Sequence, residues 1–139
     1  MDDPEYAYET SVTVRFRDLD QTGLVHNSVL LIYVEEARVR YFRDVIGIDI
    51  TETNGAVARQ EIDYEHTVAL GSALTVRYRT THIGDSSITM GFEVIADDTL
   101  AARGEVVHIV LDDTGEVQSV PNEWRENIRS FEPRSIDMA

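Results

Sequence analysis

The stretch from residue 28 to residue 46 constrains the fold more than any other part of the chain. Its apolar residues recur every three or four positions: Leu30, Val34, Ala37, Tyr41 and Val45. This spacing predicts one long amphipathic helix. The apolar stripe is widened by Leu31, Phe42 and Ile46. A helix that is apolar on more than one side needs cover on several sides, and a curved sheet can provide it.

The ends and the outer surface of this helix carry supporting signals. Asn27 or Ser28 can cap its start, and Gly47 can end it. Two pairs of opposite charge are spaced so that they meet on a helix surface: Glu36 with Arg40, and Glu35 with Arg38. A helix of about 19 residues is roughly 28 Å long.

The other apolar segments alternate as half-buried β-strands do. In residues 8–17, one face carries Val12, Val14 and Phe16. Three later segments each have one apolar face: Ala58, Ile62, Tyr64 and Val68; Leu74, Val76 and Tyr78; and Ile88, Met90, Phe92 and Val94. Residues 100–111 are apolar on both faces, which predicts a strand that is central or at an interface. Turn residues separate the segments: Gly71, Gly84-Asp85, Asp97-Asp98 and Asp113-Thr114-Gly115.

The predicted order is a strand, a long helix and then four strands in a meander. We therefore expect an α+β fold in which a five-stranded antiparallel sheet wraps one central helix. Strands of about 10 residues reach roughly 33 Å, so the sheet can cover the whole helix. Pro121 favours a short helix over 121–130, with Trp124 and Ile128 packing on the body. With 139 residues, the chain is expected to form a single domain, 1–139.

The composition excludes several classes of protein. Hydrophobic residues make up 42% of the chain, which is enough for a core, and no apolar run is long enough to span a membrane. The first residues, MDDPEYAYE, are acidic and contain no apolar segment of the kind found in secretory signals. Cysteine is absent, so neither a disulfide framework nor a thiol nucleophile is possible. These features predict a cytoplasmic protein.

The chain has many more acidic than basic residues, 26 against 12. The net charge is −14, and all 12 basic residues are arginine. Such a surface repels nucleic acid and anionic membranes, so we expect neither as a partner. It also resembles the proteins of organisms that keep molar salt in the cytosol. At about 1 M salt the Debye length is roughly 3 Å, which would screen the self-repulsion.

The segment from Arg15 to Gly47 carries a recognisable motif. It contains a D-x-D-x-x-G turn formed by Asp18, Asp20 and Gly23. Asn27 and the helix sequence Y-x-x-E-A-R, from Tyr33 to Arg38, follow the turn. With the later strands around Tyr64, the Gly71 turn and the turn from Gly84 to Ser87, this pattern resembles hotdog-fold thioesterases of the 4-hydroxybenzoyl-CoA type over roughly residues 8–130.

This resemblance implies hydrolysis of acyl-CoA thioesters. Asp20 matches the catalytic aspartate of the family and would act as a nucleophile or a general base. N–H groups near Asn27 and Ser28 would hold the oxyanion at the helix start. Gly23, Val25, Ser28 and Tyr64 are the substrate-binding candidates. Without the resemblance, Asp20 reads as an ordinary turn or capping residue.

His26 departs from the family pattern, in which a histidine commonly follows the glycine directly. It either donates a proton to the leaving thiolate or lies at a subunit contact. Asp18 could act as a second catalytic carboxylate, but such a residue is more often a strand-end or turn residue that hydrogen-bonds the loop. A metal site from Asp18 and Asp20 is not expected because no further ligands cluster nearby.

The other candidates have structural explanations. His66, His82 and His108 are scattered on strands, and Glu65 is expected to face water. Arg59, Arg77 and Arg79 either meet coenzyme A phosphates or pair with carboxylates. No cofactor is expected beyond the coenzyme A of the substrate.

The resemblance also implies a homodimer, with a homotetramer as a further option, because pockets in this family lie between subunits. Two other functions stay open. A hotdog hydratase or dehydratase could use Asp20 with His26, and the same fold also serves non-catalytic acyl-binding modules.

If the acidic surface is an adaptation to salt, KCl should stabilise the protein by screening its repulsion. We expect the melting temperature to rise continuously between dilute buffer and molar KCl. A melting temperature that does not change with KCl would contradict this interpretation.

Overall fold

The computed structural model describes residues 6–133 and 136–138; the acidic start, residues 1–5, lies outside this part. The elements in chain order are β1 (Tyr8–Val12), α1 (Asn27–Tyr41), β2 (Gly55–Tyr64), β3 (Leu74–Ile83), β4 (Ser87–Ala96), β5 (Thr99–Val110), α2 (Asn122–Phe131) and β6 (Asp137–Met138). Short helical turns are present at Phe16–Asp18, Phe42–Ile46 and Ile50–Glu52.

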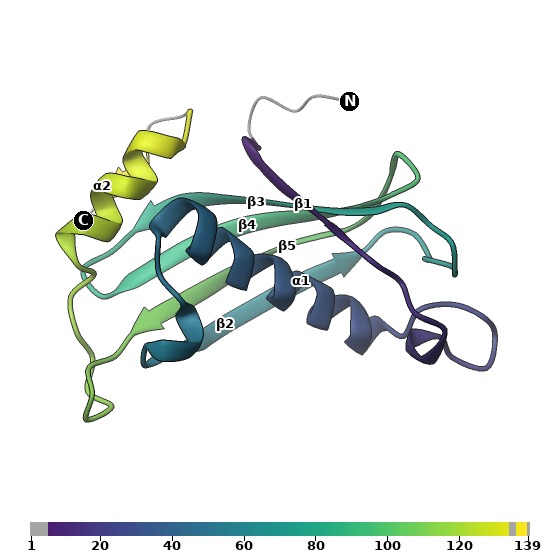
Figure 1. Ribbon diagram of the computed structural model, residues 1–139, viewed down its shortest axis with the longest axis horizontal. Coiled ribbons are helices and arrows are strands. Elements are labelled where there is room, and N and C mark those ends of the chain that lie inside the picture. Colours follow the sequence, from purple (N-terminus) through teal and green to yellow (C-terminus); the bar gives the residue numbers. More distant parts are fainter. Residues whose placement is uncertain (1–5, 134–135, 139) are drawn as a thin grey trace.

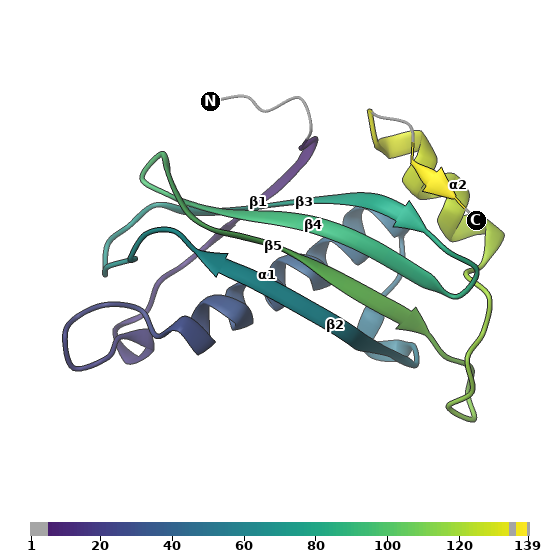
Figure 2. The same ribbon diagram turned by 180° about the vertical axis from the view of Figure 1, so that it is seen from behind.

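One antiparallel sheet of five strands covers one long helix. The strands lie in the order β1-β3-β4-β5-β2, and α1 runs along one face of the sheet (Figure 1). Figure 2 shows the opposite face, with α1 behind the strands. The predicted α+β hotdog fold is therefore confirmed. A two-residue strand, β6, was not predicted and adds to β3 in parallel.

The predicted four-strand meander is wrong in one respect. Strands β3, β4 and β5 do follow one another, but β2 pairs with β5 at the far edge and not with β3. The side of β3 that β2 would need is taken by β1, which pairs with it from Tyr8 opposite Tyr78 to Val12 opposite Leu74. β2 is consequently an edge strand, whereas β5 is central, one of the two options predicted for residues 100–111.

The predicted helix over 28–46 is confirmed with a change in its last turn. α1 ends at Tyr41, and Phe42–Ile46 continue it as a wider π-helical turn, in which the N–H of Gly47 donates to the Phe42 carbonyl at 2.8 Å. Gly47 then ends the helix with a φ of 87°. The core-facing residues are fully buried, among them Val34, Ala37, Tyr41 and Phe42.

The first predicted strand is shorter than expected. β1 ends at Val12, and Val14 is still buried, but Phe16 lies in a 3-10 turn and is 80% exposed instead of facing the core. The Asp18 carboxylate accepts the backbone N–H of Arg15, which turns the chain and ends the alternation.

The predicted β2 face also needs a correction. The strand ends at Tyr64 rather than continuing to Val68, and a bulge between Val57 and Arg59 interrupts the alternation at Ala58. Val68 is buried nonetheless, because its carbonyl accepts the N–H of Val25 and ties this loop to the start of α1.

The predicted C-terminal helix is α2, one residue later than expected, with Pro121 at the N-cap. Ile128 is fully buried and Trp124 meets the ring of Phe42 edge-on, as expected. Just after α2, Glu132 is buried and accepts the Tyr41 hydroxyl at 2.7 Å. This contact fastens the end of the chain to the end of α1.

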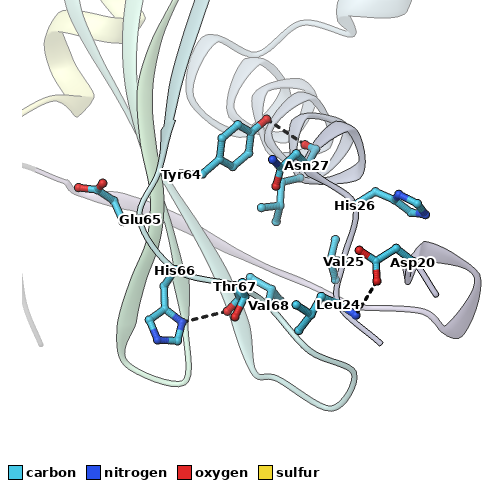
Figure 3. A pocket seen from close by; sticks show the side chains of 11 residues that line it. Asp20, Leu24, Val25, His26, Asn27, Tyr64, Glu65, His66, Thr67 and Val68 are labelled. Atoms are coloured by element: carbon cyan, nitrogen blue, oxygen red, sulfur yellow. Dashed lines mark hydrogen bonds between the residues drawn. The ribbon is translucent and has the colours of Figure 1, made fainter. Parts of the chain in front are cut away.

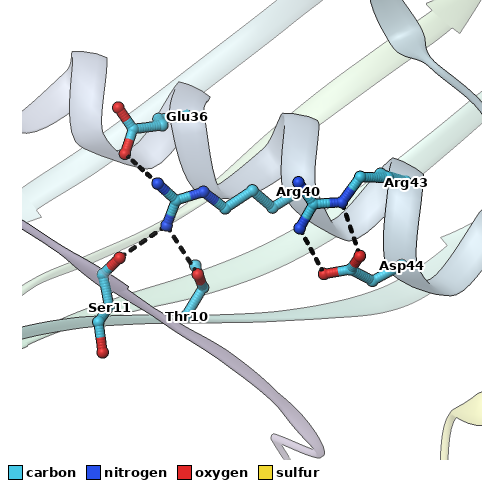
Figure 4. A network of polar contacts seen from close by, with 6 residues as sticks. All are labelled: Thr10, Ser11, Glu36, Arg40, Arg43 and Asp44. Atoms are coloured by element: carbon cyan, nitrogen blue, oxygen red, sulfur yellow. Dashed lines mark hydrogen bonds and ion pairs between the residues drawn. The ribbon is translucent and has the colours of Figure 1, made fainter.

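Of the two predicted charge pairs, one is present. Arg40 contacts Glu36 at 2.8 Å and also donates to Thr10 and Ser11, so it joins α1 to β1 (Figure 4). Glu35 forms no ion pair with Arg38 in the described part of the chain. Arg38 instead points into the core, where its Nη1 lies 3.0 Å from His108 Nδ1.

His108 is a buried structural residue, as the sequence suggested. It is 3% exposed on β5, its ring lies against Phe42, and an added Cβ at Gly55 would come within 2.6 Å of its Nε2. Burial, and secondarily the positive charge of Arg38, lowers the pKa of His108 to about 4. The imidazole is therefore neutral in the folded protein at neutral pH and can accept from Arg38.

This environment predicts a defined pH dependence of stability. Histidine in an unfolded chain has a pKa of about 6.5. Between this pH and the lower pKa of the folded state, His108 binds a proton in the unfolded protein but not in the folded protein. Above about pH 6.5, His108 should not reduce the free energy of unfolding. Near pH 4 it should reduce this free energy by up to about 3 kcal/mol. We expect urea unfolding of His108→Gln to show a smaller loss of unfolding free energy between pH 7 and pH 4 than the parent protein. Equal losses in both would contradict this account.

Candidate active site

The chain between β1 and α1 folds tightly around the side chain of Asp20. Asp20 Oδ1 accepts the backbone N–H groups of Thr22 at 2.8 Å and Leu24 at 3.2 Å, together with the Thr22 hydroxyl. The N–H of Asp20 donates to the Leu24 carbonyl at 2.7 Å and closes the turn. Gly23 has a φ of 83°, which glycine adopts without strain. The position of the Asp20 carboxylate is therefore fixed.

These hydrogen bonds also favour the ionised form of Asp20. The Thr22 hydroxyl, followed by the N–H groups of Thr22 and Leu24, lowers the pKa of the Asp20 carboxyl. Oδ2 has no hydrogen-bond partner in the described part of the chain. The side chain is thus an ionised carboxylate with one oxygen available for chemistry.

The same turn occurs a second time, away from this site. Asp112 Oδ1 accepts the N–H groups of Thr114 at 2.8 Å and Glu116 at 2.9 Å and also the Thr114 hydroxyl, in an equivalent D-x-T-G sequence. The N–H of Asp112 likewise donates to the Glu116 carbonyl at 2.8 Å. The hydrogen bonds of Asp20 are therefore those of an ordinary turn. What distinguishes Asp20 is its location beside the start of α1.

Asp18 holds the loop in place. Its Oδ2 accepts the Tyr33 hydroxyl at 2.5 Å and the Arg15 N–H at 3.1 Å, and its carbonyl accepts the N–H of His26 at 3.1 Å. The Tyr33 hydroxyl is the main reason that the pKa of Asp18 is lowered. These contacts agree with the expectation that Asp18 holds the loop.

The start of α1 leaves backbone donors available. His26 is the N-cap, so the prediction that Asn27 or Ser28 caps the helix is wrong. No side chain caps α1 and its first turn has no acidic residue. Within the described residues, the N–H groups of Asn27 and Ser28 have no acceptor. Free N–H groups and the positive end of the helix dipole together favour a negative atom here.

A pocket of about 480 Å³ opens in front of this helix start. Asp20 and His26 lie on one side of it, and Tyr64 approaches from β2, with its hydroxyl donating to the Asn27 carbonyl at 3.0 Å (Figure 3). The side chains of His26 and Asp20 lie beside each other, and His26 is the smallest contributor to the lowered pKa of the Asp20 carboxyl. The pocket is lined by Asp20, Leu24, Val25, His26, Asn27, Leu30, Tyr64, Glu65, His66, Thr67 and Val68.

The pocket brings together five of the seven residues that the sequence singled out: Asp20, Val25, His26, Asn27 and Tyr64. Gly23 and Ser28 do not line it. Glu65 was expected to face water; it is exposed, but it also lines the pocket. His66 was treated as a strand residue. The loop after β2 places it at the pocket because the N–H groups of Glu65 and His66 both donate to the Ala101 carbonyl. The signal for His66 was its position directly after the Tyr64 strand.

Two negative findings apply to the described residues. No group of three or more histidine, cysteine, aspartate or glutamate side chains in residues 6–133 and 136–138 could hold a metal ion. Searched over the same residues, the helices include none that is long and apolar enough to cross a membrane.

The fold and the pocket at the helix start define a protein of the hotdog class. Residues 14–128 match the family model of the Thioesterase-like superfamily. The chain therefore belongs to this superfamily.

Individual relatives agree with that assignment. The chain is 39% identical to a thioesterase from Thermus thermophilus whose crystal structure contains coenzyme A and Zn; the match covers 95% of this chain and 98% of the other, with a TM-score of 0.88. A predicted thioesterase from Bacillus stearothermophilus, at 23% identity, shares the fold with a TM-score of 0.82 over 92% and 98% of the two chains. The uncharacterised protein YsmA of Bacillus subtilis is 27% identical over 88% of this chain and 86% of its own length.

Proposed function

We propose that this protein is a cytoplasmic thioesterase of the 4-hydroxybenzoyl-CoA type that hydrolyses acyl-CoA thioesters in molar salt. The observation that carries the proposal is the juxtaposition of an ionised carboxylate with a free oxygen, Asp20, and an uncapped helix start in one pocket. Coenzyme A bound to the Thermus thermophilus thioesterase supports a coenzyme A thioester as the substrate.

The start of α1 would stabilise the negative charge that develops on the thioester during the reaction. A thioester carbonyl placed in the pocket would direct its oxygen at the N–H groups of Asn27 and Ser28. These donors would stabilise the negative charge that develops on the oxygen when the carbonyl carbon is attacked. Gly23 supports this arrangement indirectly because it closes the turn that leads to the helix.

Asp20 would act as the nucleophile or as the general base. Its Oδ2 either attacks the carbonyl carbon directly or takes a proton from an attacking water. A lowered pKa keeps Asp20 ionised at neutral pH, as either role requires. Direct attack forms a mixed anhydride with Asp20 as the carbon–sulfur bond breaks, and a water then hydrolyses this anhydride to the free acid and regenerates the carboxylate. Attack by water gives the free acid in one displacement, with the proton of the water taken up by Asp20. In both routes the coenzyme A thiolate leaves. His26, exposed beside Asp20, is the group that can protonate the thiolate.

The pocket walls would orient the rest of the substrate. Val25, Leu30 and Val68 are buried apolar residues that can contact the acyl group or the end of the pantetheine arm. Tyr64 holds the start of α1 by its hydrogen bond to the Asn27 carbonyl, and it also lines the pocket.

A second candidate function is favoured by the closeness of Asp20 and His26. A carboxylate and a histidine together can add water to an enoyl-CoA or remove it. Such a hydratase would leave the thioester intact, so release of free thiol distinguishes the two reactions. A non-catalytic acyl-binding module would give neither product.

Substituting Asp20 tests the proposal. We expect the parent protein, assayed in high KCl against a panel of acyl-CoA thioesters, to release free thiol. Asp20→Asn should lose at least about 100-fold in kcat because the attacking group is removed. Asp112→Asn changes the equivalent carboxylate in the second D-x-T-G turn and should retain full activity. Equal activity of Asp20→Asn and the parent protein would remove Asp20 from the mechanism, and enoyl-CoA hydration without thiol release would favour the hydratase.

We also propose that the protein works as a homodimer, with a tetramer as the larger option. β2 is an edge strand, and Val57 and Tyr64 on it are 40% and 38% exposed. An exposed edge with apolar side chains favours pairing with another strand. Since the pocket opens beside the end of β2, a second copy at this edge would also cover the pocket.

Sedimentation velocity in high KCl tests this arrangement. We expect the parent protein to sediment as a dimer or a larger assembly. Val57→Lys should dissociate more readily, because it places a charge at the edge of the sheet. A parent protein that stays monomeric at micromolar concentration would contradict the proposal.

A further inference from the structure

A second cavity lies on the other side of the turn that holds Asp20. Its volume is about 360 Å³, and it is formed between the 3-10 turn after β1 and the outer surface of α1. Arg15, Arg17 and Arg40 line it together with Ile32 and Tyr33. A quarter of the 12 basic residues of this acidic chain thus gather around one small cavity.

Two of these arginines form no ion pair in the described part of the chain. Elsewhere arginines form ion pairs, for example Arg43 with Asp44 and Arg103 with Glu65. Arg40 is paired with Glu36. Neither Arg15 nor Arg17 forms an ion pair within residues 6–133 and 136–138, although the chain has 26 acidic residues.

The Asp18 carboxylate is close enough to both arginines to feel their charge, but it forms no ion pair with either side chain in the described part of the chain. Asp18 also lines the cavity, but its Oδ2 accepts the Tyr33 hydroxyl and the backbone N–H of Arg15. The guanidinium groups of Arg15 and Arg17 therefore remain available to an anion from outside the chain. Guanidinium groups bind phosphate with two parallel hydrogen bonds, which makes phosphate a good match.

The same surface exposes apolar groups. Phe16, between the two arginines, is 80% exposed, and Ile32 on the facing side of α1 is 60% exposed. These are among the most exposed large apolar side chains of the described chain. A flat apolar group beside phosphate-binding arginines suits a ligand that combines phosphates with an aromatic base.

We propose that this cavity binds the adenine nucleotide portion of the coenzyme A thioester, with its phosphates on Arg15 and Arg17 and its base against Phe16 or Ile32. The inference rests on the proposed function. It identifies where the charged end of that substrate lies, and it replaces Arg59, Arg77 and Arg79 as the phosphate candidates, since all three have partners.

The position fits one substrate spanning both cavities. Asp18 lines the arginine cavity and Asp20 lines the active-site pocket, only two residues apart in the same turn. Arg15 and Asp20 are separated by at most about 18 Å even along an extended chain. The pantetheine arm would cross this turn and bring the thioester to the start of α1.

An acidic carrier protein is the competing source of negative charge. Such a protein would have to dock over a wide area on a chain whose net charge is −14, and the two negative charges would repel each other. A nucleotide enters a cavity in which three arginines outnumber two carboxylates, Asp18 and Glu36. The structure therefore favours the small ligand.

Direct binding tests the proposal without relying on turnover. We expect calorimetry to show that 3′,5′-ADP competes with coenzyme A for the parent protein. The double variant Arg15→Gln/Arg17→Gln should bind coenzyme A at least about 10-fold more weakly. Arg129→Gln, in α2 at the opposite end of the molecule, is the matched control and should bind as the parent does. Unchanged affinity in the double variant, or no competition by 3′,5′-ADP, would overturn the proposal.

Kinetic measurements then distinguish recognition of the nucleotide from recognition of the reacting thioester. The double variant should lose kcat/KM for an acyl-CoA by the same factor and keep its value for the matching acyl-pantetheine, which has no nucleotide. Equal losses with both substrates would overturn the proposal. If the parent protein turns over neither substrate, the thioesterase proposal fails while the calorimetry still decides whether the cavity binds the nucleotide. Loss of activity with an acyl-carrier protein alone would assign the arginines to the competing partner and contradict the nucleotide site.

Discussion

The burial of α1 along one face of the sheet is the interaction on which the other features depend. Val34, Ala37 and Tyr41 have no exposed surface, and the Tyr78 hydroxyl donates to the Val34 carbonyl at 2.9 Å inside the core. These contacts fix the helix along the strands. One end of α1 is then closed by α2 and Glu132, while the other end stays open to solvent beside the pocket. An uncapped helix start can serve chemistry only because it is held in place in this way.

The loop before α1 uses that rigid helix as its support. Tyr33, on the second turn of α1, binds the Asp18 carboxylate, and the His26 N–H binds the Asp18 carbonyl. Asp18 thus joins the loop to α1 at two points, Tyr33 and His26. The turn around Asp20 adds its own hydrogen bonds but also exists at Asp112, so it has no functional meaning by itself. Its attachment beside the helix start makes the Asp20 carboxylate relevant to a thioester carbonyl.

Much of this architecture could be predicted from periodicity. The helical spacing from Leu30 to Val45 and the alternation in β3 and β4 predicted the central helix and the sheet that covers it. Gly47 predicted the end of the helix. Strand order could not be predicted, because periodicity gives the face of a strand and not its neighbour, and β2 pairs with β5 instead of β3.

The site was predictable in part, for similar reasons. The motif and its resemblance to known thioesterases identified Asp20, His26, Asn27 and Tyr64, which the structure places around one pocket. The sequence assigned His66 to a strand, and it expected Phe16 to be buried because the alternation continues to that residue. The Ala101 carbonyl, from the distant strand β5, redirects the segment at His66. The Asp18 carboxylate, only three residues after Arg15, turns the chain at Phe16, and periodicity alone does not reveal this local turn.

A crystal structure with an inert acyl-CoA analogue, in which a methylene group replaces the thioester sulfur, tests the central claim most directly. The account predicts that the carbonyl oxygen lies within hydrogen-bond distance of the N–H of Asn27 or Ser28, with Asp20 Oδ2 facing the carbonyl carbon. A carbonyl bound away from the start of α1, with Asp20 turned from it, would contradict the account.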